Sequence, residues 1–186
     1  MLQEYSVEMA NVHAALLAKL AKQGFDELQI KPFNTDLIAV ATGPGSFTGL
    51  RIGLSYAKGL SYGLQKPIIG VSNFRILAQS APPQNSKVVT LIDARRGNWY
   101  MAIFSGGKKD LIEKKLIAGK ELSPYLSDDT IIVANQSVPG IENLHIIGTY
   151  GAGTLCQVGL NQYLEEGPDS LDALEPLYLQ PFAGVL

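Results

Sequence analysis

The chain has 186 residues and a formal net charge of −2, with 46% hydrophobic and 17% charged residues. This composition excludes intrinsic disorder, the apolar runs are too short for a membrane span, and the first eleven residues do not form a secretory signal. Residues 1–80 carry a net charge of +2 and residues 81–186 one of −4, so neither part has the concentrated positive charge that autonomous nucleic-acid binding needs.

The first eighty residues alternate between helical patterns and short apolar runs, which is typical of a parallel α/β unit. Gly24 is expected to end the first helix, Thr48 or Ser46 to cap the second, and Ser72 to cap the third. The expected elements are a helix over 6–23, a strand over 36–42, a turn over 43–49, a helix over 48–64, a strand over 67–71 and a helix over 73–80.

The stretch 81–86, which holds two prolines, is the predicted linker. It separates an N-terminal lobe over 1–80 from a C-terminal lobe over 87–186. Glycines between the next apolar runs predict an antiparallel meander at the start of the second lobe. Its expected elements are strands over 87–93, 98–104, 111–117, 130–134 and 144–147, a helix over 154–166 and a short extended piece over 177–180.

The glycine-rich loop Gly43–Gly49 lies between a predicted buried strand and a helix, where free backbone N–H groups suit an anion. It lacks the Gly-Lys-Ser/Thr end of a Walker loop, and its glycines do not fit the dinucleotide spacing. Two interpretations stay open: a turn with a helix cap, or a ligand contact. The residues that would make the ligand contact are Gly43, Gly45, Ser46 and Thr48.

The helix that follows carries small residues four apart, and it is apolar around most of its circumference. Each glycine within a helix costs about 1 kcal/mol relative to alanine, and a small-residue face lets another backbone come close. The helix is therefore either buried within its own lobe or shared between the core and a partner protein. The small residues are Gly45, Gly49, Gly53 and Ala57, with Gly59 and Gly63 repeating the spacing.

Catalytic groups are sparse in this sequence. His13 and His145 lie far apart, no zinc-binding histidine pair is present, and we expect neither a metal nor a cofactor. Cys156 is interpreted as a buried structural cysteine, and one cysteine favours a reducing, cytoplasmic setting. Asp93 is a candidate metal ligand or base, although such a residue more often fixes a turn. The neighbouring Arg95-Arg96 pair either touches phosphate or is simply solvated.

Three blocks resemble the bacterial TsaB (YeaZ) family, in the right order and over most of the chain. The first, Ala41–Ala78, reads ATGPGSFTGLRIGLSYAKGLSYGLQKPIIGVSNFRILA and is highly specific. The others are Leu91–Phe104 (LIDARRGNWYMAIF) and Glu175–Gln180 (EPLYLQ). Asn11-Val12-His13 falls where that family has a histidine at the start of its first helix.

The resemblance implies an α/β protein with the two-lobed actin/Hsp70-like ATPase (RNase H-like) fold. It implies a non-catalytic scaffold or activator in the formation of tRNA threonylcarbamoyladenosine. The partners would be a TsaD-like catalytic subunit, a TsaE-like ATPase reached through the complex, tRNA bound only within the complex, and a second copy in homodimers. The family's interface uses the first two helices, here Asn11, His13, Leu16, Leu17, Leu20, Gly49, Gly53, Ala57 and Leu60.

Two departures from the family pattern bear on this expectation. The family opens with about thirty residues of strands, so the first lobe is expected to lack its opening strands. Either the start of this sequence is truncated or misassigned, or the missing strands come from elsewhere. Asn98 stands where the family has an acidic residue, which weakens any case for chemistry at that turn. The rival hypotheses are a nucleotide-binding protein that uses the Gly43–Gly49 loop and, less favoured, a metallopeptidase.

Overall fold

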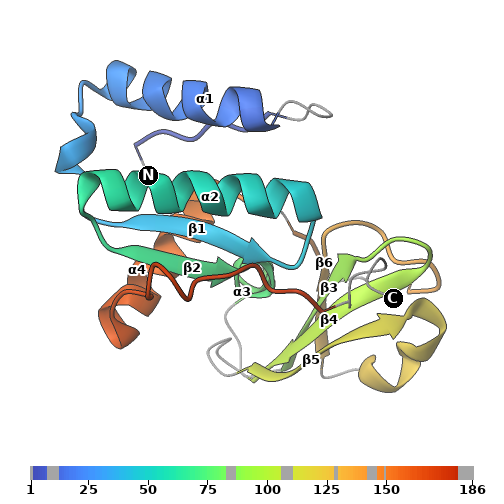
Figure 1. Ribbon diagram of the computed structural model, residues 1–186. Helices are drawn as coiled ribbons and strands as arrows, with labels where there is room; N and C mark the ends of the chain where they lie inside the picture. Colours follow the sequence, from blue (N-terminus) through green and yellow to red (C-terminus); the bar gives the residue numbers. More distant parts are fainter. Residues whose placement is uncertain are drawn as a thin grey trace, which may run out of the picture. The chain divides into compact units, whose positions relative to one another are not determined.

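The structure is a computed structural model that describes residues 2–7, 13–82, 87–105, 111–127, 130–141, 146–148 and 150–179 (Figure 1). The chain forms two compact units, and each is discontinuous in sequence. Unit 1 comprises Met1–Thr42, Ser46–Val71 and Gly151–Pro176, and unit 2 comprises Gly43–Gly45, Ser72–Tyr150 and Leu177–Leu186. None of the described helices is long and apolar enough to span a membrane.

Unit 1 has a two-stranded sheet with helices on both faces. Strands β1 and β2 point the same way in Figure 1, as expected when a helix connects them. Helix α2 packs Leu54 and Ala57 against Ile38, Val40 and Ile68 of the sheet. The elements are α1 (His13–Leu28), a 3-10 turn η1 (Pro32–Asn34), β1 (Ile38–Gly43), α2 (Phe47–Leu64), β2 (Ile68–Ser72) and α4 (Ala152–Glu166).

Helix α4 comes from the far end of the sequence and closes the other face of this sheet. A Cβ on Gly159 would lie 3.0 Å from Ala39, 3.1 Å from Ile69 and 3.2 Å from Val71. Only glycine therefore lets α4 approach the strands this closely. The chain after α4 then follows the outer edge of β2, where Asp169 N–H donates to the Ile68 carbonyl at 2.9 Å.

Unit 2 is built on a five-stranded sheet of order β5-β4-β3-β6-β7. The β3–β4 and β4–β5 pairs are antiparallel, which confirms the predicted meander, and β6 joins β3 in parallel. One face packs on Phe74 and Leu77 of the short helix α3, and the other packs on Leu122 and Val138. The elements are α3 (Asn73–Ala78), β3 (Lys87–Asp93), β4 (Asn98–Phe104), β5 (Leu111–Ala118), 3-10 turns η2 (Gly119–Glu121) and η3 (Ser123–Tyr125), β6 (Thr130–Ala134) and β7 (Ile146–Ile147).

The prediction for the first helix was wrong at both ends. Ser6 and Val7 are not helical, α1 continues to Leu28, and Gly24 lies within it rather than ending it. A Cβ on Gly24 would lie 3.4 Å from the ring of Tyr5, so the glycine lies against the extended segment at residues 2–7. The residue just past the helix is Gln29, in the left-handed region at φ 55°.

The compact units do not follow the predicted lobes of 1–80 and 87–186. Helix α3 belongs to unit 2, because Phe74 and Leu77 are buried against its sheet, and α4 belongs to unit 1. Part of the predicted linker at 81–86 lies outside the described residues, and Ala81 is buried in the unit 2 core. The predicted lobes assume that each lobe is one continuous segment, whereas each compact unit combines separate segments of the chain.

Candidate functional site

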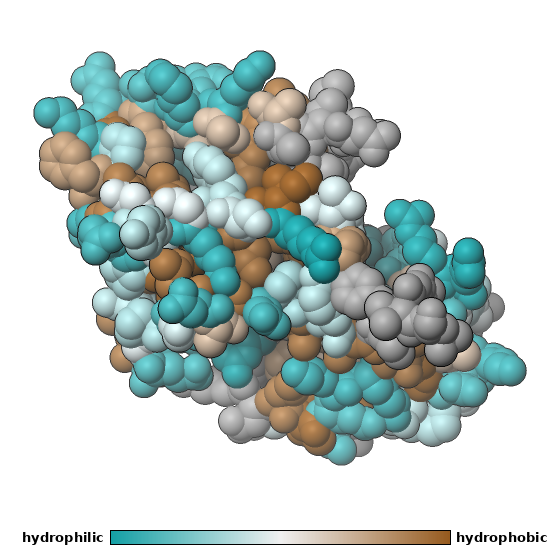
Figure 2. All heavy atoms as spheres, in the orientation of Figure 1, coloured by the Kyte–Doolittle hydropathy of each residue, from teal (hydrophilic) through white to brown (hydrophobic). Residues whose placement is uncertain are grey.

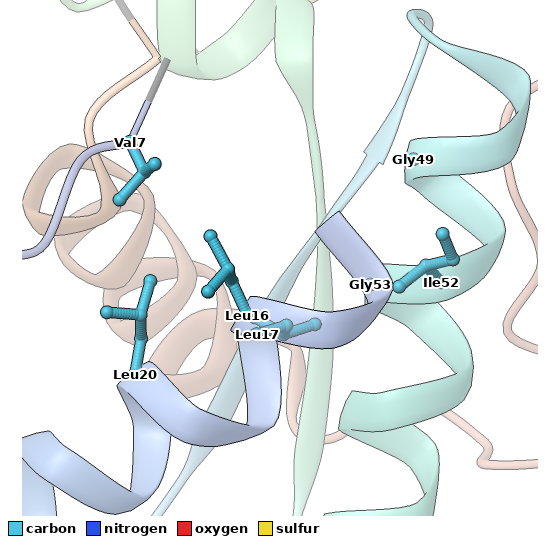
Figure 3. A pocket seen from close by; sticks show the side chains of 7 residues that line it. All are labelled: Val7, Leu16, Leu17, Leu20, Gly49, Ile52 and Gly53. Carbon is cyan, nitrogen blue, oxygen red and sulfur yellow. The ribbon is translucent and has the colours of Figure 1, made fainter. Parts of the chain in front are cut away.

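An apolar cavity of about 260 Å³ lies between helices α1 and α2 and is partly open to solvent. In Figure 3, Leu16 and Leu20 of α1 point toward Val7, and Leu17 points toward α2. Figure 2 shows hydrophilic side chains along the outer side of α1 and hydrophobic surface between the two helices. The lining residues are Val7, Leu16, Leu17, Leu20, Gly49, Ile52 and Gly53. Five of them, all except Val7 and Ile52, belong to the predicted partner face.

Three glycines of α2 have open space where a side chain would stand. Among the residues that the structure describes, a Cβ placed on Gly53, Gly59 or Gly63 would meet nothing within 4 Å, and none of the three has a positive φ. Neither packing against the described part of the chain nor backbone conformation therefore requires glycine at these positions. Each glycine still destabilises the helix by about 1 kcal/mol relative to alanine.

The structure places the remaining predicted partner residues in different surroundings. Ala57 is buried in the core with Leu54, and Leu60 is partly buried against the same cluster. Asn11 and the side chain of His13 lie outside the described residues. We therefore keep Leu16, Leu17, Leu20, Gly49 and Gly53 as the candidate face, together with Val7 and Ile52, which the sequence pattern did not single out.

The extended segment at residues 2–7 forms one wall of the cavity, and side-chain hydrogen bonds attach it to α1. The Tyr5 hydroxyl donates to Glu27 Oε2 at 2.6 Å, and Gln3 Nε2 donates to the same oxygen at 2.5 Å. The bond to the carboxylate raises the pKa of Tyr5 to about 12 and lowers the pKa of Glu27. These bonds hold Val7 opposite the leucines of α1.

Glu4 attaches the same segment to α4. Its carboxylate accepts hydrogen bonds from Ala152 N–H at 3.1 Å and Gly153 N–H at 2.9 Å, which caps the start of the helix. Cys156, which was expected to be buried, is exposed on α4. Desolvation and the charge of Glu4 raise the pKa of its thiol, so the helix start does not activate it as a nucleophile.

The loop at Gly43–Gly49 uses much of its polar capacity within the chain. Ser46 caps α2 by accepting from Gly49 N–H at 3.3 Å, which confirms one of the two predicted caps. The carbonyls of Gly43 and Pro44 accept hydrogen bonds from Ser72 Oγ and Asn73 Nδ2. Ligand contacts by Gly43, Gly45, Ser46 and Thr48 stay a prediction. Among the described residues, no group of three or more His, Cys, Asp or Glu side chains could hold a metal ion.

A family model described as TsaD, tRNA N6-adenosine threonylcarbamoyltransferase, matches residues 7–144. The chain belongs to this family. The TsaB proteins of Escherichia coli and Bacillus subtilis, named tRNA threonylcarbamoyladenosine biosynthesis proteins, are 38% and 32% identical over 57% and 60% of this chain. The matched stretches cover 46% and 48% of those relatives, so the chain spans about half the length of the curated relatives that it matches.

A solved structure supports the fold. The Pseudomonas aeruginosa protein described as having similarity to peptidase YEAZ matches with a TM-score of 0.77 at 23% identity, over 92% of this chain and 86% of that one. Together with the TsaB relatives it confirms the resemblance to the TsaB (YeaZ) branch and the expected α/β fold.

Proposed function

We propose that this chain is a non-catalytic subunit in tRNA threonylcarbamoyladenosine formation, and that α1 and α2 bind the TsaD-like subunit that performs the transfer. A TsaE-like ATPase would act through the same complex. The names of the TsaB relatives support the pathway, and the resemblance supports the division of labour between the subunits.

The observation that carries this proposal is a set of glycines in α2 whose open side faces no other described residue of the chain. Gly53, Gly59 and Gly63 each have room for a methyl group, yet the helix retains the less stable residue. A partner backbone in contact with α2 would make glycine necessary, because a Cβ would hold the two backbones apart. The neighbouring cavity would receive an apolar side chain of that partner, with Leu16 and Leu20 as its wall.

The proposal is tested by mixing the chain with the TsaD homologue of its own organism and measuring the molar mass of the product by light scattering. We expect a heterodimer with the wild-type chain, and loss of that heterodimer with Gly53→Leu. Lys58→Leu is the matched control, because Lys58 is partly exposed on α2 and lies about 100° or more around the helix from Gly53, Gly59 and Gly63. Circular dichroism checks that both variants fold.

Absence of a heterodimer with the wild-type chain would refute the proposed pairing, and so would normal pairing by Gly53→Leu. Homodimers that Gly53→Leu abolishes, without any binding to the TsaD homologue, would assign the face to a second copy instead. Threonylcarbamoyl transfer by the chain alone would refute the non-catalytic role.

A further inference from the structure

The turn between β3 and β4 in unit 2 holds two arginines in an unfavourable backbone conformation. Arg95 has φ 69° and Arg96 has φ 54°, and Gly97 continues the left-handed run at φ 76°. Glycine or asparagine is favoured in this region, because a Cβ crowds the following carbonyl. The sequence instead places two long cationic side chains there, and both residues are exposed.

The surrounding contacts fix this turn. The Asp93 carboxylate accepts from Arg95 N–H at 2.9 Å, and Asp93 N–H donates to Asn135 Oδ1 at 3.0 Å. On the other side, Gly119 N–H donates to the Gly97 carbonyl at 2.8 Å, which brings the start of η2 to the turn. The two guanidinium groups therefore extend from a fixed base rather than from a loose loop.

The tip defined by Arg95, Arg96 and Lys120 is cationic and contains no large apolar side chain. Lys120 directly follows Gly119 and is exposed, as is its neighbour Glu121. Asp93 is the other acidic group at the tip, and its Oδ1 is engaged by the turn. Among the described residues, neither arginine has an ion-pair partner.

We propose that this tip contacts phosphate groups of the RNA bound by the complex, an inference that rests on the proposed function. Guanidinium groups match phosphate oxygens bidentately, and RNA contacts are polar and hydrated. A protein partner is less suited to the tip, because arginine anchors of protein contacts lie in desolvated pockets, and this tip has no apolar residue that would exclude water around its exposed arginines. No exposed large hydrophobic residue falls within 93–98 or 119–121. The contact is supplementary: it adds phosphate contacts to a complex whose main RNA affinity lies elsewhere.

The test measures tRNA affinity of the complex as a function of salt, with the wild-type chain and with Arg95→Asn/Arg96→Asn. Each phosphate contact contributes about 0.7 to 0.9 to the slope of log affinity against log salt. We expect the variant to bind more weakly and to lose about 1.4 to 1.8 of that slope. Between 50 and 200 mM salt, the wild type should thus lose roughly 7- to 12-fold more affinity than the variant.

A second measurement separates RNA contact from a structural role. Asparagine tolerates the left-handed region, so the variant should unfold at the same temperature as the wild type or at a higher one. The matched control, Lys31→Asn/Lys66→Asn, removes the same charge from unit 1 and should leave the salt slope unchanged. A variant with unchanged affinity and slope would overturn the inference.

Binding of this chain to the TsaD homologue is measured separately from tRNA affinity, because it tests the proposed function rather than the inference about the tip. If the arginine variant binds the TsaD homologue more weakly, but the complex formed at saturating concentrations binds tRNA with the wild-type affinity and salt slope, the tip docks a protein and the inference is wrong. If even the wild-type chain does not bind that homologue, the proposed function fails. The chain alone, titrated with tRNA at low salt, then decides the inference: equal affinities of wild type and arginine variant would overturn it.

Discussion

Replacing Gly53 and Gly59 by alanine should change stability and partner binding in opposite directions. Both positions are helical, and no described residue lies within 4 Å of an added Cβ, so each alanine removes backbone entropy from the unfolded chain without a clash against that part of the structure. At about 1 kcal/mol per site, and with the two sites roughly 9 Å apart along α2, the double variant should gain about 2 kcal/mol. For a chain of this size, that gain raises the unfolding midpoint by about 4 to 8 °C.

The same two methyl groups should weaken binding to the TsaD homologue, because they would separate backbones that are proposed to be in contact. A loss of tenfold or more in affinity corresponds to at least about 1.4 kcal/mol. Urea unfolding and calorimetric titration with the homologue measure the two effects on the same preparation. A variant that is more stable and binds as tightly as the wild type would refute the reasoning about the glycines, and a destabilised variant would show that the space is not open.

Three further outcomes are expected. Gly159→Ala should destabilise unit 1 by about 1 to 3 kcal/mol in urea unfolding, because its Cβ would lie 3.0 to 3.2 Å from three side chains of the sheet. Ser46→Ala should cost about 1 kcal/mol through loss of the α2 cap. For the Tyr5–Glu27 hydrogen bond, the directions of the two pKa shifts determine how the stability changes with pH. The raised pKa of Tyr5 gives stability that is full below pH 10 and lost toward about pH 12. The lowered pKa of Glu27 gives stability that is lost as the pH falls through that lowered pKa. In thermal melts over a range of pH, Tyr5→Phe should therefore reduce both the alkaline and the acidic loss of stability.

The elements that the sequence predicted well are those with strong local signals. Strands β3, β4 and β6 have the predicted bounds and β5 extends one residue further, because apolar and β-branched residues dominate these segments. For β7, residues 144 and 145 of the predicted strand lie outside the described residues. Ser72 caps α3 as predicted, by accepting from Phe74 N–H at 3.2 Å. The boundaries of α1 were missed because a glycine within a helix was interpreted as its end, while the contact that makes room for it comes from Tyr5, nineteen positions away.

The candidate face was predicted only in part, for a geometric reason. Residues four apart advance by about 40° around a helix at each step, since one turn takes 3.6 residues. Gly49 and Gly53 therefore share the cavity, whereas Ala57 has turned about 80° from Gly49 and is buried against the sheet. Val7 could not be found from periodicity, because it reaches the cavity from an extended segment.

The contribution of α4 to unit 1 affects the order in which a ribosome can complete the two units. Almost all of unit 2 is one uninterrupted stretch, Ser72–Tyr150, so its sheet is available to fold while α4 is still being synthesised. The β1–β2 sheet must wait for Gly159 to cover one face and for Asp169 to reach its edge. Although its strands come first in the sequence, unit 1 is therefore completed only after the sheet of unit 2 has been synthesised, and nascent chains halted before residue 159 would leave Ala39, Ile69 and Val71 without that cover.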